Sequence, residues 1–393
     1  MTGDAQPYPH VAIACGGTGG HLFPGIAVGQ EVLARGGRVT LFISEKEVDR
    51  QAVQSVQDMR IVALPSVGLT WGRWFAFFVG LLRSRKLALK QFQNDPPQVV
   101  LAMGGFTSAG PVLAARRVRA ACFLHDSNVI PGRANRWLAR RADEIFVAFP
   151  DTQKHFKTAT QVTGTPVRSE FHSVNATDSR TALGLRSADP VLLIMGGSQG
   201  AAGINRLVLE ALPVMIERFP LLQFVHLTGA TDLDLVQSAY HRLGVKALVQ
   251  VFCPEMHHAL GAATLAISRA GGSSLAEIVA TRTPSVVVPF PAAADQHQQF
   301  NAAALARGGG ALVVDQETVG GPEFTRLLVE LLNDPSKLAA MRERLTTGQP
   351  LDAATQIVDA MFARLPGRQA VMPGVSLRAD DTPCNNRFHS VTS

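Results

Sequence analysis

The sequence predicts an α/β protein built from two Rossmann-like domains, each a doubly wound parallel sheet, that face each other across a cleft. The main observation is a repeat: an apolar segment runs into a glycine-rich turn and then into a helical pattern, at residues 11–35 and again at residues 191–219. Each copy is typical of the opening unit of a parallel sheet. The length of 393 residues agrees with two domains, since a domain usually has about 100 to 200 residues.

Apolar segments of strand length alternate with helical patterns through both halves of the chain. This alternation predicts doubly wound sheets, whose ligands bind at the carboxyl ends of the strands. The expected strands are residues 11–15, 39–43, 99–103, 120–124, 144–148, 191–195, 223–228, 248–252, 265–268, 285–289 and 311–314.

The domain junction is expected between Thr165 and Pro190, where the strand–helix alternation pauses. We expect the first domain at residues 8–168 and the second at residues 169–350. A helical stretch at about 353–365 is expected to return to the first domain. The tail at 366–393 is polar and aperiodic and is expected to be disordered.

Composition excludes several classes of protein. Apolar residues make up 46% of the chain and charged residues 17%, which permits a large core and excludes a disordered protein. The aromatic residues form no regular stacking platform, so no nucleic acid partner is expected. The cysteines stand far apart, with no C-x-x-C pair, which disfavours a zinc site or disulfide framework and agrees with a reducing compartment. We expect neither a secretory signal nor a membrane-spanning segment.

Both glycine-rich turns, Gly16–His21 and Gly196–Gly200, suit a phosphate, because glycine lets the backbone approach closely and the next helix offers unpaired N–H groups. No Gly-Lys-Ser/Thr follows either turn, which argues against an ATPase. The dinucleotide pattern G-x-G-x-x-G fails at Leu22, although Glu45 could mimic a ribose-binding acid. A nicotinamide-dependent oxidoreductase therefore stays as an alternative, as does tight strand-to-helix packing without a ligand.

Polar segments that follow predicted strands of the first domain are expected to meet at one edge of its sheet. His21 begins the first helix, where partial positive charge favours the neutral imidazole and a role as proton acceptor. Residues 103–108 and 124–128 are the other two segments. Together they predict a polar cleft made from sequence-distant pieces.

The second domain offers groups that suit hydroxyls or amides. Leu275, Ile278 and Val279 form the predicted buried stripe of a helix, which leaves Glu277 on another face, suited to a pair of sugar or ribose hydroxyls. On the next helix His297 and Asn301 share a face, and Gln298 follows His297.

Four separated motifs, Gly16–His21, Gly196–Ala201, Ser268–Gly272 and Asp295–Asn301, resemble those of the MurG family, bacterial peptidoglycan glycosyltransferases with the two-domain GT-B fold (glycosyltransferase family 28). The resemblance covers roughly residues 10–365. It implies an inverting transfer of N-acetylglucosamine (GlcNAc) from UDP-GlcNAc to the C4 hydroxyl of the MurNAc unit in undecaprenyl-pyrophosphoryl-MurNAc-pentapeptide (lipid I). The product would be lipid II for the cell wall, and hence for cell shape and division. The alternative within this fold is another UDP-sugar transferase that acts on a glycolipid.

The resemblance also assigns site residues. It implies that His21 is the catalytic residue and that the substrate-binding residues are Thr18, Gly19, Gly20, Asn128, Arg168, Ser198, Glu277, His297 and Gln298. Thr18 and Asn128 would serve the acceptor side, Arg168 and Ser198 the diphosphate, Glu277 the ribose, and the pair His297 and Gln298 the GlcNAc. Two segments depart from the family pattern: Asp126-Ser127 replaces a Glu-Gln pair, and Ser108–Pro111 replaces a shorter Ser-Gly-Pro.

No cofactor and no metal are expected. The sequence shows no Asp-x-Asp that would hold a metal on the diphosphate, so helix N-termini, Ser198 and Arg168 would balance its charge.

A membrane surface is expected as a further partner. Residues 1–168 hold 20 basic and 11 acidic side chains, and the stretch from Met59 to Asn94 holds no acidic one. Basic and large apolar side chains alternate there, which suits attachment to anionic lipid, with a core helix that has a solvated basic face as the alternative. With the resemblance, we expect a peripheral enzyme on the cytoplasmic face of the cell inner membrane. The patch comprises Arg60, Arg73, Arg83, Arg85, Lys86, Lys90, Trp71, Trp74, Phe75, Phe77, Phe78, Leu81 and Leu82.

Overall fold

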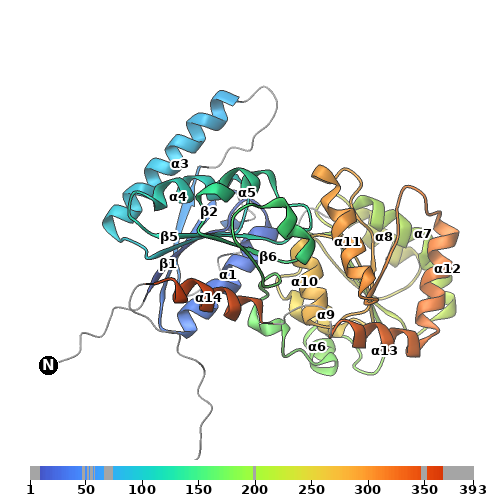
Figure 1. The fold of residues 1–393 in the computed structure, drawn as a ribbon. Coiled ribbons are helices and arrows are strands. Elements are labelled where there is room, and N and C mark those ends of the chain that lie inside the picture. Colours follow the sequence, from blue (N-terminus) through green and yellow to red (C-terminus); the bar gives the residue numbers. More distant parts are fainter. Residues whose placement is uncertain are drawn as a thin grey trace, which may run out of the picture.

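The computed structural model describes residues 9–46, 49–50, 53, 56, 58–65, 74–197, 201–346 and 352–365. It contains two α/β domains that lie side by side (Figure 1). The first has a seven-stranded sheet in the order β3-β2-β1-β4-β5-β6-β7, and the second has a six-stranded sheet in the order β10-β9-β8-β11-β12-β13. Every strand pair is parallel. The predicted fold class is confirmed.

The predicted strands are present, and the structure adds one strand at each edge of the first sheet, β3 and β7. Their side chains are mostly exposed or half-buried, so they lack the apolar run that marks a buried strand. The strands are β1 (His10–Ala14), β2 (Arg38–Ser44), β3 (Arg60–Leu64), β4 (Val99–Ala102), β5 (Ala121–Asp126), β6 (Glu144–Val147), β7 (Thr160–Val162), β8 (Val191–Met195), β9 (Gln223–Leu227), β10 (Ala247–Gln250), β11 (Leu265–Ser268), β12 (Ser285–Val287) and β13 (Ala311–Val313).

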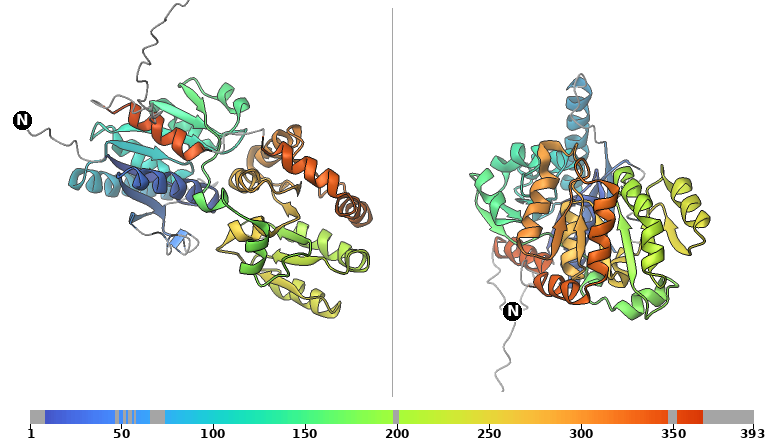
Figure 2. Two further views of the ribbon diagram at one scale, coloured as in Figure 1. Left: turned by 90° about the horizontal axis from the view of Figure 1, so that it is seen from below. Right: turned by 90° about the vertical axis from the view of Figure 1, so that its right-hand side faces the viewer.

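Helices cover both faces of each sheet (Figures 1 and 2). They are α1 (Gly19–Ala34), α3 (Trp74–Asn94), α4 (Ala109–Ala115), α5 (Arg133–Leu138), α6 (Ala176–Ala182), α7 (Ala202–Arg218), α8 (Leu233–Arg242), α9 (Met256–Ala262), α10 (Gly272–Ala280), α11 (His297–Arg307), α12 (Gly321–Leu332), α13 (Pro335–Arg344) and α14 (Ala353–Ala363). Short 3-10 helices lie at Phe106–Ser108, Ala139–Arg141, Pro150–His155, Ser169–Phe171 and Ala294–Gln296.

The central strand of the first sheet is buried on both faces, which explains its continuous apolar sequence. Val11 and Ile13 face a core shared with α1 and α14, whereas Ala12 and Ala14 face a core shared with α3 and α4. Helix α14 follows the second domain in sequence, yet it packs on α1 of the first domain (Figure 1).

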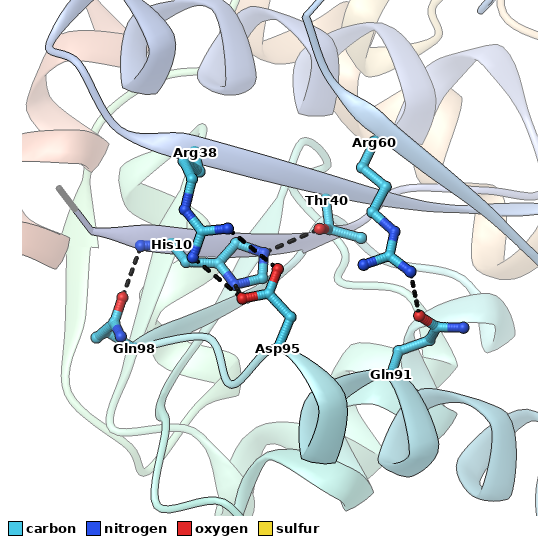
Figure 3. A network of polar contacts seen from close by, with 7 residues as sticks. All are labelled: His10, Arg38, Thr40, Arg60, Gln91, Asp95 and Gln98. Atoms are coloured by element: carbon cyan, nitrogen blue, oxygen red, sulfur yellow. Dashed lines mark hydrogen bonds and ion pairs between the residues drawn. The ribbon is translucent and has the colours of Figure 1, made fainter. Parts of the chain in front are cut away.

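A polar network fixes the C-terminal end of α3 to the amino ends of three strands (Figure 3). Asp95, directly after α3, accepts two hydrogen bonds from Arg38 of β2, at 3.2 and 3.0 Å. His10 of β1 lies 3.5 Å from the same carboxylate, and Arg60 of β3 donates to Gln91 at 2.6 Å. The hydrogen bonds from Arg38 lower the pKa of Asp95. The helix is therefore anchored at this end.

Each sheet has a switch point, where the strand order reverses and where doubly wound folds bind ligands. In the first sheet it lies between β1 and β4, and in the second between β8 and β11. The two glycine-rich turns predicted from the sequence begin after β1 and β8, while Gly104 and Gly105 follow β4, and Gly271 and Gly272 follow β11. The topology therefore brings the turns to the carboxyl edges of the two sheets.

Two fully buried imidazoles should make the folded state sensitive to acid. Burial lowers the pKa of His125 and of His226 to about 4, whereas an unfolded histidine titrates near 6.5. The unfolded chain therefore binds more protons as the pH falls from 6.5 toward 4, and stability is lost over that window. We expect the free energy of unfolding to fall by about 1 to 2 kcal/mol per histidine between pH 7 and pH 5.

Urea denaturation at several pH values measures this loss. His226→Gln should flatten the pH dependence, while His172→Gln, at an exposed position, should leave it unchanged. A wild-type midpoint that is constant from pH 7.5 to 5 would contradict the prediction.

Candidate active site

A cavity of about 540 Å³ lies where the two switch points face each other. Its walls come from the N-terminal turn of α1, the turns after β8 and β11, and the start of α10. Five of the residues singled out from the sequence line it: Gly19, Gly20, Arg168, Glu277 and Gln298. Neither domain alone encloses this space.

Glu277 lies on α10 and is half-buried, while Leu275, Ile278 and Val279 of the same helix are buried in the core. Burial raises the pKa of Glu277 to about 7, although Arg168 opposes the shift. A carboxylate at this position can accept hydrogen bonds from two adjacent hydroxyls.

The Arg168 guanidinium contacts two aromatic rings. It lies 4.8 Å from the ring centre of Phe23, on α1, and 5.1 Å from that of Phe171. Glu170 forms an ion pair with it at 3.3 Å. These two cation–π contacts and the ion pair restrict the guanidinium and hold its charge in the cavity wall.

Gln298, at the start of α11, is fixed by the turns after β11 and β12. Its Oε1 accepts from the N–H of Ala270 at 3.2 Å and from the N–H of Phe290 at 3.0 Å. With the oxygen engaged twice, the amide NH₂ group is what this side chain offers a ligand. The neighbouring His297 has Nδ1 2.7 Å from the carbonyl of Ala294, so Nδ1 carries a proton and donates to that carbonyl.

His21, on the first turn of α1, is packed against the turn after β4. A Cβ added at Gly104 would lie 2.8 Å from the imidazole, and Gly104 has φ +113°. Both the close approach and the backbone conformation therefore require glycine at this position. Thr18 Oγ1 lies 3.1 Å from His21 Nδ1. Burial lowers the pKa of His21 to about 4, and nearby His297 also lowers it. The imidazole is therefore neutral at pH 7.

The loop after β5 is organised by one carboxylate. Asp126 is buried and accepts hydrogen bonds from the N–H of Asn128 at 3.0 Å, the N–H of Gly132 at 2.9 Å and the amide of Asn135 at 2.9 Å. Burial raises the pKa of Asp126. Asn135 also lies near the turn that holds His21, since a Cβ added at Gly104 would lie 3.5 Å from its amide nitrogen. The loop that carries Asn128 thus lies beside the His21 turn.

Arg269 was missed as a site residue, although it stands in the Ser268–Gly272 motif. It is buried, lines the cavity, and donates to the carbonyls of Val288 and Pro289 at 3.0 and 3.1 Å. Burial lowers its pKa to about 10. Its position directly after β11, at the carboxyl edge of the sheet, was the available signal.

Ser198 lies outside the described residues. Within the part of the chain that the structure describes, no group of three His, Cys, Asp or Glu side chains is arranged to hold a metal ion. An Asp-x-Asp pair, Asp232 and Asp234, does occur at the start of α8, but Asp232 accepts from Asn205 at 2.7 Å and neither aspartate lines the cavity.

The outer face of α3 carries exposed apolar side chains. Phe75, Phe78 and Leu82 are 82%, 53% and 61% exposed and follow one another at helical spacing. Phe77 is buried and packs edge-on against Phe106 with ring centres 5.2 Å apart, so its assignment to the surface patch is wrong. Trp71, Arg73 and the side chain of Trp74 lie outside the described residues. None of the described helices has the length and apolarity to cross a bilayer.

Comparisons with known proteins agree over most of the chain. Residues 11–147 match the glycosyltransferase family 28 N-terminal domain, and residues 191–357 match the glycosyltransferase family 28 C-terminal domain. A curated relative from Geobacter sulfurreducens is named "UDP-N-acetylglucosamine--N-acetylmuramyl-(pentapeptide) pyrophosphoryl-undecaprenol N-acetylglucosamine transferase". It is 37% identical over 362 residues, which cover 89% of this chain and 97% of the relative.

Solved structures give the same arrangement of domains. The crystal structure of Acinetobacter baumannii MurG superposes with a TM-score of 0.69 at 26% identity, over 90% of this chain and 99% of that one. A putative UDP-N-acetylglucosamine 2-epimerase from Listeria monocytogenes reaches a TM-score of 0.67 at 13% identity, over 90% and 96% of the two chains. The second match shows the shared fold alone.

Proposed function

Since this chain belongs to glycosyltransferase family 28, we propose that it transfers GlcNAc from UDP-GlcNAc to the MurNAc unit of lipid I and so forms lipid II. The observation that carries the proposal is the match of both family domains, together with 37% identity to a relative of that name over nearly its whole length. The enzyme is a UDP-GlcNAc-dependent glycosyltransferase of peptidoglycan synthesis with the GT-B fold.

The cavity supplies what the donor needs. Glu277 accepts the two ribose hydroxyls, and Gln298 with His297 contacts the GlcNAc. Arg168 and the glycine-rich N-terminal ends of α1 and α10 face the diphosphate with positive potential, which stabilises the charge on departing UDP. The family resemblance assigns Ser198, which lies outside the described residues, to the same diphosphate. The transfer then runs without a metal or a cofactor.

His21 accepts the proton of the acceptor hydroxyl. The C4 oxygen of MurNAc bonds to the anomeric carbon, the bond from that carbon to the diphosphate oxygen breaks, UDP leaves with the electron pair, and the hydroxyl proton passes to the neutral imidazole. Thr18 orients the ring through Nδ1, 3.1 Å away, which leaves Nε2 for the acceptor. Asn128 and the loop after β5 form the acceptor wall beside it.

The exposed face of α3 attaches the enzyme to an anionic membrane surface, where a polyprenyl-anchored acceptor is found. Phe75, Phe78 and Leu82 are followed by exposed Lys86 and Lys90 at helical spacing, which gives an apolar half and a basic half to one face. The network at Asp95 holds the far end of the helix on the sheet (Figure 3). The enzyme works in this way as a peripheral protein of the inner membrane, on the cytoplasmic face, with no nucleic acid partner.

Replacing Phe75, Phe78 and Leu82 with Ser should release the protein from vesicles that contain anionic lipid. These side chains are exposed, so the melting temperature and the turnover of a short-chain water-soluble acceptor should change little. Flotation with vesicles measures the release. Phe77→Ser is the contrasting variant, because that ring is buried and its loss should lower the melting temperature. Unchanged vesicle binding by the triple variant would contradict the membrane assignment.

A ligand-induced shift in melting temperature tests the donor class directly. UDP should stabilise the protein, because a ligand that binds only the folded state raises its stability. NAD should not. Stabilisation by NAD without stabilisation by UDP would instead favour the nicotinamide-dependent alternative.

A further inference from the structure

One buried amide joins the two domains. Asn301 lies on α11, one turn after His297, and is completely buried. Its Oδ1 accepts from the N–H of Val129 at 2.9 Å, in the first domain. Its Nδ2 donates to Oδ1 of Asn128 at 3.0 Å and to the carbonyl of Ala270 at 3.1 Å. A single side chain thus bonds the loop after β5 and the turn after β11.

Gln298 of α11 also binds the turn after β11. The N–H of Ala270 donates to Gln298, and the carbonyl of Ala270 accepts from Asn301. The backbone N–H and C=O of Ala270 are therefore both bonded to side chains of α11. Any shift of the turn after β11 would disturb the bonds that Asn301 makes to the first domain, because buried polar groups are costly to leave unpaired.

Ion pairs between the domains lie at both ends of α11. Asp295, just before the helix, pairs with Arg136 at 2.5 Å and with Arg133 at 3.7 Å, both on α5. Arg307, at the other end, pairs with Asp151 at 2.9 Å. These pairs are substantially exposed, and exposed pairs contribute little to stability, so the buried Asn301 is the stronger link.

The two domains are also tightly packed beside this link. A Cβ at Gly272 would collide with Ser127, the residue before Asn128, and Ser273 donates to the carbonyl of Gly20 at 2.9 Å. The loop after β5 is therefore packed against the N-terminus of α10 and bonded to α11 at once. It has no freedom to move independently of the donor-side helices while these contacts hold.

We propose that Asn301 is a positioning residue that couples the donor side of the cleft to the acceptor loop. It does not touch either substrate: it holds Asn128 and Val129 in register with α11, whose first turn carries His297 and Gln298. Donor binding that orders α11 then orders the acceptor loop as well. This inference rests on the proposed transferase function.

Kinetics of Asn301→Ala test the coupling. We expect the KM for a soluble lipid I analogue to rise or kcat to fall, with kcat/KM for the acceptor reduced about 10- to 100-fold. The Kd for UDP should stay within about threefold, because two of the three bonds lost are those to the acceptor loop and the turn after β11 keeps its bond to Gln298. Gln299→Ala, at an exposed position on the same helix, is the matched control and should retain wild-type values. A UDP Kd that weakens as much as the acceptor kcat/KM falls would make Asn301 a merely structural residue of the donor site.

If the variant folds poorly, hydrogen exchange on the wild-type protein provides a second test of the coupling between α11 and the acceptor loop. UDP should slow exchange in α11 and also in residues 127–132. Protection confined to the second domain would overturn the coupling. Lack of disaccharide product with the wild-type enzyme would count against the proposed function instead. In that case the link between the domains can still be tested without ligand, by comparing the exchange rate of the Val129 amide in the wild type and in Asn301→Ala.

Discussion

His21→Ala is expected to lower kcat by about 10²- to 10⁴-fold while the Kd for UDP stays near the wild-type value. The imidazole acts on the acceptor proton in the transition state, whereas the nucleotide is held mainly by the second domain. Single-turnover kinetics and calorimetric titration with UDP measure the two quantities. Thr18→Val, which removes the hydroxyl 3.1 Å from Nδ1 but keeps the imidazole, should cost far less than removing the ring.

The pH profile gives the sharper form of this prediction. Because burial lowers the pKa of His21 to about 4, the imidazole is neutral and able to accept a proton across the whole range above pH 5. Protonation removes this capacity, so kcat/KM should fall only as the pH drops toward 4, and the His21→Ala variant should lack that acidic limb. A raised KM for UDP-GlcNAc with the acidic limb intact would show that His21 orients the diphosphate and is not the base.

Glu277→Ala should raise the KM for UDP-GlcNAc by about 10- to 150-fold, the loss expected when two charge-assisted hydrogen bonds worth roughly 1.5 to 3 kcal/mol disappear. The fold should barely respond, because the side chain faces the cavity and Leu275, Ile278 and Val279 form the buried face of the helix. Unchanged KM with a much lower melting temperature would make Glu277 structural.

The raised pKa of Glu277 adds a signature in pH. The carboxylate, not the carboxylic acid, is the strong acceptor, and its pKa is about 7, so the donor KM should fall as the pH rises from 6 to 8. Glu277→Gln should remove this dependence. Since burial disfavours the charged form, the same variant should also be slightly more stable than the wild type at pH 8.

The features that could be predicted from the sequence are those determined by residues close together in the chain. The glycine turns could be recognised because backbone with positive φ and close packing, as at Gly104 against His21, leaves room only for glycine. The central strands could be predicted because both of their faces are buried, which makes their sequences continuous apolar runs. The side of α10 that carries Glu277 followed from helical spacing.

The features that could not be predicted from the sequence depend on contacts between residues far apart in the chain. The edge strands β3 and β7 have one open flank and no distinctive pattern. Phe77 resembles its neighbours in sequence, and only its packing on Phe106 separates it from the exposed Phe75 and Phe78. The bonds of Asn301 to Asn128 and Val129 join the two domains through one side chain, and helical periodicity carries no information about a partner 172 residues away.

An assay of product formation tests the transfer of GlcNAc. The purified protein is incubated with radiolabelled UDP-GlcNAc and a lipid I analogue in the presence of EDTA. We predict a labelled GlcNAc–MurNAc product with inverted anomeric configuration and an equal amount of UDP, both strongly reduced with the His21→Ala variant. Release of free GlcNAc or no disaccharide at all, from a protein whose melting temperature UDP raises, would show that the protein is not a GlcNAc transferase that acts on lipid I.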